Sequence, residues 1–384
     1  MKRLVTACLL VLVTAGVAAR AAPLQDAPHH PLQWVAVVEN RIWTDSEAEA
    51  QYVGAKIADA GYNAVRIFVP YSPGQAEIEN DKLRLCNAAT SARNNGLQLI
   101  VSLVGVGSDY VPIGWAKVDR LNKTVNDHMY ELFQVETDEE GNERSVGCTT
   151  DVKEFNVEIF NEVNSERWWI DPDRYVRILS RVYPVAKAKA EELGVEVTII
   201  CGALTSNDDP LGYIHRMGEE MRRLGITTLP CDVFSFHPYP FNSSESPDTP
   251  HPAGNFVGLA DHGLLRAALK EAFGYVPRIF LSEMSWESDI PKSQRWRYWG
   301  KVPPSSKPVS EPTQGKFYAL ALKRCTEQPK VIGCAIFHLF DDPQLEQWQS
   351  GQYYYSNQLD EAHPAVAKSS LADVRSAALA AQGP

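Results

Sequence analysis

Short runs of apolar, mostly β-branched residues alternate along this chain with longer segments whose apolar residues recur every three to four positions. Such runs are typical of buried parallel strands, and the longer segments have the period of amphipathic helices. The expected strands are 34–38, 64–69, 97–104, 156–160, 195–201, 232–236, 278–281 and 331–340. The expected helices are 46–60, 81–95, 172–193, 211–224, 262–273 and 314–326, followed by an alanine-rich helix near the C-terminus.

Eight strands alternating with helices predict an α/β fold in which a parallel sheet closes into a (β/α)8 TIM barrel. A chain of 384 residues is long enough for one such barrel with its loops. We therefore expect residues 22–384 to form a single barrel domain, with an open doubly wound sheet as the alternative.

Three segments interrupt the alternation. Residues 105–150 do not show the pattern of a single helix, and within them the charged, glycine-containing stretch Val135–Gly147 indicates a surface insertion. Residues 242–258 and 288–312 are rich in proline and serine, as loops are. All three segments follow predicted strands, so we expect them on the side of the barrel where active sites are built.

The N-terminus has a pattern of its own. Lys2 and Arg3 precede the apolar run 4–17, and Ala19-Arg20-Ala21 then supplies small residues at the spacing that signal peptidase recognises. The run is shorter than the about 20 apolar residues that span a membrane. We therefore expect residues 1–21 to be a signal peptide and the mature protein to be secreted, as an extracellular or periplasmic protein.

Composition and charge narrow the class of partner. The formal net charge is −11 and there is no basic run, which argues against nucleic acid and anionic membrane surfaces as partners. This acidic charge balance suits a soluble monomer that acts on a neutral ligand. We expect it to need no cofactor. The acid pairs 208–209 and 341–342 follow predicted strands and could hold calcium, but we interpret them as solvated loop residues and expect no metal site.

The cysteines indicate an oxidising compartment. Seven are present, and without Cys8 in the expected signal peptide an even number remains. Disulfides are one interpretation, with Cys325–Cys334 across a short turn as the pair suggested, and buried free thiols are the other. None lies in a Cys-x-x-Cys motif that would suggest zinc. The remaining cysteines are Cys86, Cys148, Cys201, Cys231, Cys325 and Cys334.

Polar residues stand at or just after the ends of most predicted strands, and in a barrel such ends converge on one face. They are Glu39, Arg66, Asn161, Glu162, Asn207, His237, Tyr239, Glu283, His338 and Asp341. Glu162 and Glu283 follow the fourth and seventh strands. Two carboxyl groups that flank one bond are what glycoside hydrolysis requires.

Four short motifs and their order along the chain strengthen that interpretation. Glu-Ile-Phe-Asn-Glu-Val-Asn at 158–164, Phe-His-Pro-Tyr at 236–239, Ile-Phe-Leu-Ser-Glu at 279–283 and Asn-Ala-Val-Arg at 63–66 resemble strand-end motifs of clan-A glycoside hydrolases. The arginine motif resembles that of the cellulase-like family 5. The resemblance implies a (β/α)8 barrel that cleaves glycosidic bonds with retention of configuration.

The resemblance also implies roles at the matching positions. Glu162 would be the general acid and base, and Glu283 the nucleophile. Asn161 would bind the sugar 2-hydroxyl. Tyr239 would donate to the nucleophile, and Arg66 would lie beneath it.

His237 would line the same pocket close to Glu162. Two departures from the family 5 pattern stand at the third and eighth strands. Residues 102–105 lack a histidine that is common there, and 337–340, which include His338, lack the usual tryptophan. We expect His338 to contact substrate, and Phe337, Phe340 or Trp286 to take the place of the indole platform. A family 39-like or unclassified clan member is the alternative to family 5.

Aromatic residues predict a long binding cleft, because flat rings cover the C–H faces of sugars. Packing of loops onto the barrel is the alternative role for these rings, and we expect Trp34 and Trp43 in the core. Tryptophans that follow strands are Trp115, Trp168, Trp169, Trp286, Trp296, Trp299 and Trp348.

Together these features predict a secreted, retaining glycoside hydrolase that cleaves a β-linked polysaccharide, as an endo-β-glucanase or β-mannanase does. An exo-acting β-glycosidase and a non-catalytic carbohydrate-binding barrel are the alternatives. A serine esterase has no support, because the chain lacks a Gly-x-Ser-x-Gly motif.

Overall fold

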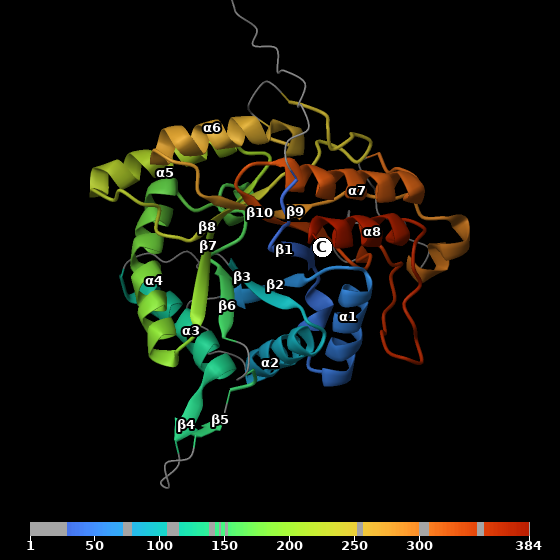
Figure 1. Cartoon of the computed structure of the whole chain (residues 1–384), viewed down its shortest axis with the longest axis horizontal. Helices are drawn as coiled ribbons and strands as arrows, with labels where there is room; N and C mark the ends of the chain where they lie inside the picture. The colour runs from blue at the N-terminus through green and yellow to red at the C-terminus, as the bar shows by residue number, and fades with distance from the viewer. Residues whose placement is uncertain are drawn as a thin grey trace, which may run out of the picture.

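A closed barrel of eight parallel strands organises the chain in the computed structural model, which describes residues 29–71, 79–105, 115–137, 143–145, 147–149, 153–251, 256–298, 307–343 and 349–383 (Figure 1). The closed order is β1-β10-β9-β8-β7-β6-β3-β2, which confirms the predicted TIM barrel. The expected signal peptide lies outside the described residues. The barrel strands are β1 (Trp34–Val38), β2 (Ala64–Tyr71), β3 (Gln98–Gly105), β6 (Glu154–Glu158), β7 (Glu196–Thr205), β8 (Val233–His237), β9 (Arg278–Met284) and β10 (Val331–Phe337).

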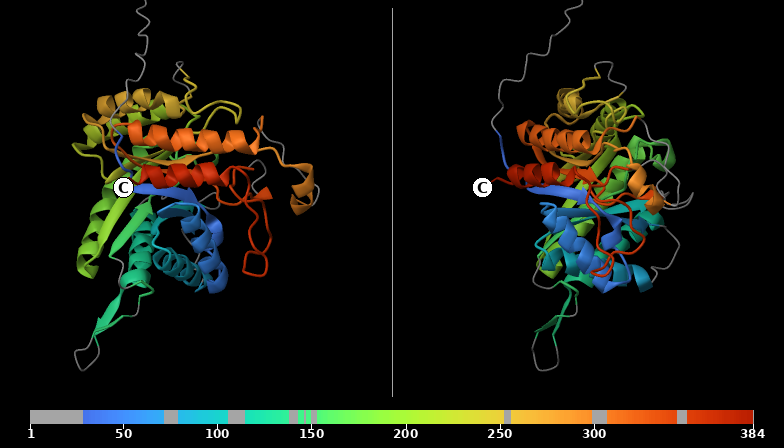
Figure 2. Two further views of the ribbon diagram at one scale, coloured as in Figure 1. Left: turned by 45° about the vertical axis from the view of Figure 1, so that its right-hand side comes forward. Right: turned by 90° about the vertical axis from the view of Figure 1, so that its right-hand side faces the viewer.

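Helices cover the outside of the barrel, as Figures 1 and 2 show. Within the described part of the chain, none of them is long and apolar enough to cross a membrane. The helices are α1 (Glu47–Asp59), α2 (Glu79–Asn94), α3 (Trp115–Phe133), α4 (Pro172–Leu193), α5 (Pro210–Leu224), α6 (His262–Phe273), α7 (Glu311–Glu327) and α8 (Leu371–Ala381).

The residue pattern of the strands explains both faces of the barrel. In β1, Trp34, Ala36 and Val38 belong to the cluster that fills the barrel interior, whereas Val35 and Val37 pack outward with the helices. Side chains alternate between faces along a strand, so a strand buried on both sides is a continuous apolar run. This is why the strands appear in the sequence as short apolar runs.

The segment 105–150 differs from expectation in two ways. It contains the 19-residue helix α3, whose buried residues Val118, Leu121, Val125, Met129 and Leu132 repeat at helical spacing. The surrounding polar residues obscured that period in the sequence.

The insertion itself is a surface hairpin of β4 (Val135–Thr137) and β5 (Glu143–Ser145), which pair antiparallel and project from the barrel (Figure 2). Its expected position on the active face was wrong. It lies between α3 and β6, and the connections from helix to strand lie at the opposite end of a barrel from the active site.

Two disulfides tie outer segments together. Cys86 in α2 is bonded to Cys148, and Cys201 in β7 is bonded to Cys231, just before β8. The suggested Cys325–Cys334 pair was wrong, because both are buried free thiols. Cys325 lies on α7 and Cys334 within β10, where the thiols contact each other without a covalent bond in the layer between helix and barrel.

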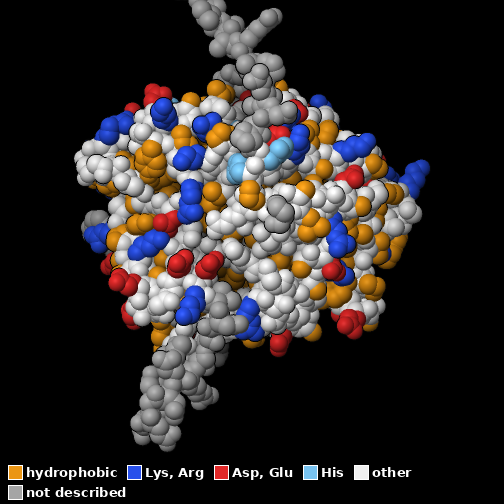
Figure 3. Space-filling view, in the orientation of Figure 1, with side chains coloured by type: hydrophobic (Ala, Val, Ile, Leu, Met, Phe, Trp, Pro, Cys, Tyr) orange, Lys and Arg blue, Asp and Glu red, His pale blue; other side chains and the backbone are white. Residues whose placement is uncertain are grey.

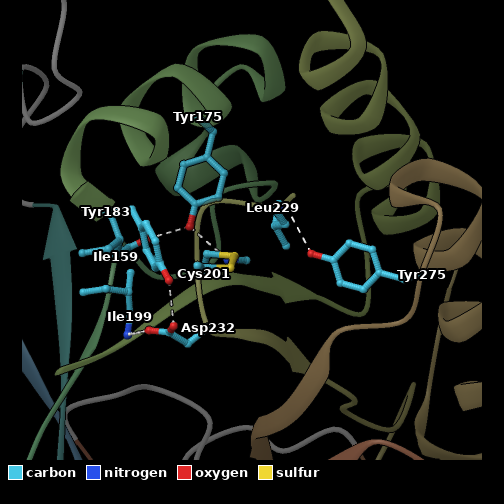
Figure 4. The surroundings of a disulfide bond; sticks show 10 residues. Ile159, Tyr175, Tyr183, Ile199, Cys201, Leu229, Asp232 and Tyr275 are labelled. Atoms are coloured by element: carbon cyan, nitrogen blue, oxygen red, sulfur yellow. Dashed lines mark hydrogen bonds between the residues drawn. A yellow bond between two sulfur atoms is a disulfide. The ribbon is translucent and has the colours of Figure 1, made fainter. Parts of the chain in front are cut away.

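Hydrogen bonds around the Cys201–Cys231 disulfide fix an irregular stretch of β7 (Figure 4). The Tyr175 hydroxyl donates to the Ile159 carbonyl at 2.7 Å and accepts from the Gly202 amide at 2.9 Å. Gly202 has φ +98°, and a Cβ there would lie 2.7 Å from the Ser235 carbonyl oxygen, so only glycine fits. This stretch follows Cys201 and leads toward the active face.

Removal of the Cys201–Cys231 cross-link tests its contribution to stability. We expect Cys201→Ala with Cys231→Ala to lower the free energy of unfolding by about 2–4 kcal/mol, because the unfolded chain regains the freedom of a closed loop. The volume-matched control is Cys325→Ala with Cys334→Ala, which removes two buried sulfurs but no covalent bond. Urea denaturation measures both, and an equal loss in the two double variants would contradict a cross-link effect.

Candidate active site

Two glutamates and a histidine meet at the C-terminal ends of the strands. Glu283 lies one residue before the end of β9, Glu162 follows β6, and His237 ends β8. One nitrogen or oxygen atom from each of the three lies within 4.8 Å of the other two. Glu283 is 3% exposed, whereas the Glu162 side chain is 18% exposed. The two carboxyl groups predicted as a pair therefore lie together but differ in their access to solvent.

A sharp turn after β6 positions Asn161 and Glu162. Phe160 and Glu162 have φ of 68° and 45°, which is the left-handed region that L-residues rarely adopt. The Asn164 side chain holds the turn against the next strand, accepting from the Thr205 amide and donating to the Asn207 carbonyl, each at 2.9 Å. Such backbone strain is frequent where function requires a particular side-chain direction. Sequence reasoning placed Asn164 in the motif but missed this role.

Arg66 lies beneath the glutamates and is fully buried. Its Nη1 donates to Glu283 Oε1 at 2.6 Å, and its Nη2 donates to Asn161 Oδ1 at 2.8 Å. Its Nε donates to Glu158 Oε2 at 3.0 Å. The contact expected between Arg66 and Glu283 is therefore present, and one cation faces two buried carboxylates.

The pKa of Glu158 shows the strength of this pairing. Burial alone would raise the pKa of this carboxyl, but the charges of Arg66 and His237 and the hydrogen bond from Ser102 hold it below its usual value. The Ser102 hydroxyl donates to Glu158 Oε2 at 2.6 Å. Glu158 therefore stays ionised and compensates part of the buried arginine charge.

Glu283 has a second donor and a close histidine. The Tyr239 hydroxyl donates to Glu283 Oε2 at 2.6 Å. Burial and the neighbouring Glu283 and Glu162 raise the pKa of Tyr239 well above its usual value, so the phenol remains a donor. His237 Nδ1 lies 3.1 Å from Glu162 Oε1, and its Nε2 lies 3.5 Å from Glu283 Oε1. Both contacts predicted for Tyr239 and His237 are thus present.

Two cavities that share Phe68 as a lining residue lie near the ends of the barrel strands. The first, about 540 Å³, is lined by Glu162 and Glu283 together with Trp168 and Phe241. The second, about 390 Å³, lies over the ends of β1 and β10, and Phe68 lines both cavities. The expected residue Asn207 lines the first cavity, whereas Glu39 and His338 line the second.

The expected aromatic platform needs correction. Trp286 is 1% exposed, packs edge-on against Tyr318, and donates its indole N–H to the Glu245 carbonyl at 2.7 Å, so it cannot stack on a sugar. The Phe337 ring centroid lies 6.3 Å from those of Phe68 and Tyr239, but Phe337 is not among the residues that line the two cavities. Trp286 was assigned to the site because it stands just after Glu283, but its side chain faces the helix layer.

Of the other residues expected at the site, some line the cavities and others are buried in the fold. Trp168 lines the first cavity, and Phe340 lines the second. Asp341 is buried and paired with Lys368 at 2.7 Å, so its charge is neutralised within the fold. Trp34 is buried in the barrel interior, as expected. The side chains of Trp115, Trp299 and Trp348 lie outside the described residues.

One group of the described residues has the spacing of metal ligands. It consists of Glu162, His237 and Glu283. The Arg66 guanidinium, however, already donates to Glu283 at 2.6 Å, and a second cation beside it would be repelled. The arrangement therefore favours acid–base and nucleophilic chemistry over metal binding.

No protein-family model matches this sequence, and no curated protein matches it. Solved glycoside hydrolases resemble the barrel. A fungal β-1,4-galactanase covers 90% of this chain and 99% of its own, with TM-score 0.57 and 15% identity. A glucosidase from Croceicoccus marinus covers 92% and 68%, with TM-score 0.59 and 11% identity. The GH5_18 protein from Streptomyces cattleya, solved with GlcNAc, covers 92% and 82%, with TM-score 0.54 and 14% identity. At these identities the likeness shows the fold alone.

Arg66 offers a direct test of the network. We expect Arg66→Met to lower the free energy of unfolding by about 3–5 kcal/mol, because it leaves Glu158 and Glu283 buried without their cation. The double variant with Glu158→Gln should recover part of the loss, since one uncompensated charge is then removed. Thermal and urea denaturation measure both, and an additive loss in the double variant would contradict the pairing.

Glu39 predicts a pH dependence of stability. Burial raises its pKa to about 7 from 4.5, so between these values the folded state keeps a proton that the unfolded state has released. Stability should therefore fall by roughly 3 kcal/mol as the pH rises through this window. Glu39→Gln cannot ionise. Between pH 4.5 and 8 its free energy of unfolding should therefore rise relative to that of the wild type by roughly 3 kcal/mol. A constant difference in urea denaturation across this range would contradict the shift.

Proposed function

We propose that this protein is a secreted, retaining glycoside hydrolase that cleaves within β-linked polysaccharides. The observation that carries the proposal is the pair Glu162 and Glu283, with carboxylate oxygens within 4.8 Å of each other at the wall of one cavity. Retaining enzymes hold their carboxyls about 5–5.5 Å apart, and inverting enzymes hold them about 6.5–9.5 Å apart to admit a water. The spacing therefore supports retention.

The different surroundings of the two carboxyls support their roles. Glu283 receives Arg66 on one oxygen and Tyr239 on the other, which favours an ionised nucleophile in a defined orientation. Glu162 is more exposed and is bonded only to His237 among these residues, so it can exchange its proton with the leaving group and with water.

The reaction then takes two displacements. Glu283 attacks the anomeric carbon while Glu162 gives its proton to the departing glycosidic oxygen, and a glycosyl ester forms on Glu283. Glu162, now a carboxylate, takes a proton from water, which attacks the ester and restores Glu283. Asn161 lines the same cavity with its Oδ1 held by Arg66, an orientation that leaves the amide nitrogen for the sugar 2-hydroxyl.

The shape of the cleft supports cleavage within a chain. Phe68 lines both cavities, which together give space for more than one sugar residue. Barrels of known glycoside hydrolases, including a β-1,4-galactanase, share the fold. Membership of clan A, near family 5, follows from the motif order and belongs to this proposal. A family 39-like position remains the alternative.

Secretion is proposed from two features. The first 21 residues have the pattern of a signal peptide, and two disulfides are present in the described chain. Disulfides form and persist in oxidising compartments. A soluble monomer without a cofactor is part of the same proposal.

Activity and mechanism are tested together. The mature protein is screened for reducing-sugar release from β-glucans, β-mannans, β-galactans and xylans beside Glu283→Gln, which keeps the size of the side chain. We expect release from at least one polymer by the wild type and loss of it in the variant. Release that persists in the variant would contradict the assignment of the nucleophile, and release of monosaccharide alone would favour exo action.

Azide distinguishes the two carboxyls. With an aryl β-glycoside, Glu283→Ala and azide should yield the α-glycosyl azide, because azide occupies the place of the nucleophile. Glu162→Ala should lose about 10²–10⁴-fold in activity with poor leaving groups and less with aryl ones. With this variant, azide should yield the β-glycosyl azide. NMR of the products assigns the anomers, and the same anomer from both variants would rule out double displacement by this pair.

A further inference from the structure

Residues that follow β8 form one wall of the first cavity. Phe241, Asn242, Ser243 and Phe256 line the cavity on this side, and we refer to these four residues as the loop wall. Phe241 is 67% exposed, and its ring lies against that of Phe256 with 5.6 Å between centroids. Phe256 itself is 8% exposed. The shape of the cavity on this side therefore depends on what holds Phe256 and Asn242.

His251 supports both of these residues. Its ring lies edge-on to that of Phe256, with 4.6 Å between centroids. Its Nε2 lies 3.1 Å from Glu245 Oε2, and Glu245 Oε1 accepts a hydrogen bond from Asn242 Nδ2, also at 3.1 Å. The His251 side chain is 19% exposed and is not among the residues that line the cavity. It therefore supports the loop wall from behind.

Asp261 fixes the other side of the ring. This residue immediately precedes α6, and its side chain is 4% exposed. His251 Nδ1 lies 3.1 Å from Asp261 Oδ2, and the His251 amide donates to Asp261 Oδ1 at 2.9 Å. The Gly258 amide also donates to Oδ2, at 3.0 Å. We refer to the contacts of His251 with Glu245 and Asp261 as the clasp, which joins the loop wall to the helix layer.

The two carboxylates of the clasp require a protonated ring. A neutral imidazole has one N–H and one lone pair, whereas an imidazolium has two N–H donors. With a neutral ring, the lone pair would face an oxygen of Glu245 or Asp261, and one of the two hydrogen bonds would be lost. Hydrogen bonds between ionised partners are also about twice as strong as those between neutral ones. The clasp therefore depends on the second proton of His251.

Other ionisable groups near the clasp in the sequence have partners elsewhere. Asp248 is paired with Arg324 of α7 at 2.7 Å. His262, the residue after Asp261, contacts the Pro329 carbonyl, and burial lowers the pKa of this histidine to about 4, so its ring stays neutral. Among the described residues, the ion pairs of the His251 ring are those with the two carboxylates of the clasp.

Histidine is the side chain that ordinarily exchanges its proton between about pH 5 and 8. We propose that His251 is a positioning residue, whose protonated ring holds the loop wall in the shape that binds substrate. Loss of the proton opens the clasp and weakens binding in the first cavity, while Glu162 and Glu283 stay in place. This inference rests on the proposed glycosidase function and adds a pH-sensitive support to its substrate site.

Glu245→Gln separates the clasp from its proton. The glutamine keeps an oxygen for Asn242 and presents an amide N–H to the lone pair of a neutral His251, so the clasp closes without the charge. The substrate is cellotetraose or mannotetraose, or the tetrasaccharide of whichever other polymer is cleaved. From about pH 5 to about pH 8, its KM should rise about three- to tenfold in the wild type relative to the variant. This ratio cancels the titration of Glu162 and Glu283, which both proteins retain.

Two further variants serve as controls. His251→Phe keeps a ring against Phe256 but has no donor, so its KM should be high throughout the pH range. Asp248→Asn breaks the other ion pair of this segment, in which Arg324 donates to both carboxylate oxygens at 2.7 and 2.9 Å. It leaves the clasp intact, so its KM should rise with pH as in the wild type. A rise that is lost in Asp248→Asn would contradict a role specific to His251.

Amide hydrogen exchange of residues 240–251 supplies a readout without turnover. At pH 8 these amides should exchange faster in the wild type than in Glu245→Gln, and the difference should vanish at pH 5.5. Comparison at one pH cancels the intrinsic exchange rate.

The two readouts separate the possible failures. Equal exchange in the two proteins at both pH values would overturn the clasp. Faster exchange at pH 8 with an unchanged KM ratio would show that the clasp opens without affecting substrate, and would overturn the positioning role. If no polymer is cleaved, the proposed function fails, and the exchange alone decides whether the proton of His251 closes the clasp.

Discussion

The buried guanidinium of Arg66 is the interaction on which the rest of the site depends. A charge without solvent is costly unless partners neutralise and orient it. Here the partners come from two other strands or their ends: Glu158 of β6, Asn161 just beyond it, and Glu283 of β9. The same bonds therefore join distant strands at the mouth of the barrel and set the position of the carboxyl group proposed as nucleophile.

Two carboxyls with the same intrinsic chemistry differ because their surroundings differ. Glu283 is almost fully buried and has a donor on each oxygen, from Arg66 and Tyr239. Glu162 stands on a turn with positive φ at the edge of the cavity, where solvent and a leaving group can reach it. Environment, rather than residue type, thus distinguishes a nucleophile from a proton donor.

The outer surface adds little to this picture. On the face drawn in Figure 3, basic and acidic side chains alternate with hydrophobic ones across the described residues, so neither sign of charge dominates it. The residues of the proposed site instead line the first cavity. Phe337 stands at the end of β10, with its ring centroid 6.3 Å from that of Tyr239, and Arg41 lies among acidic residues that line the second cavity.

The sequence by itself determined the barrel, because strands buried on both faces must be continuous apolar runs and their alternation with helices admits few folds. The contact of Arg66 with Glu283 was expected from the resemblance of the motifs to those of clan-A glycoside hydrolases, and it is present. Only the tertiary structure decided that Trp286 faces the helices and that Cys201 pairs with Cys231. It also decided that His338 lies in a second cavity. The reason is physical: burial, pairing and cavity shape depend on loops and helices that are distant along the chain, and no local pattern records their packing.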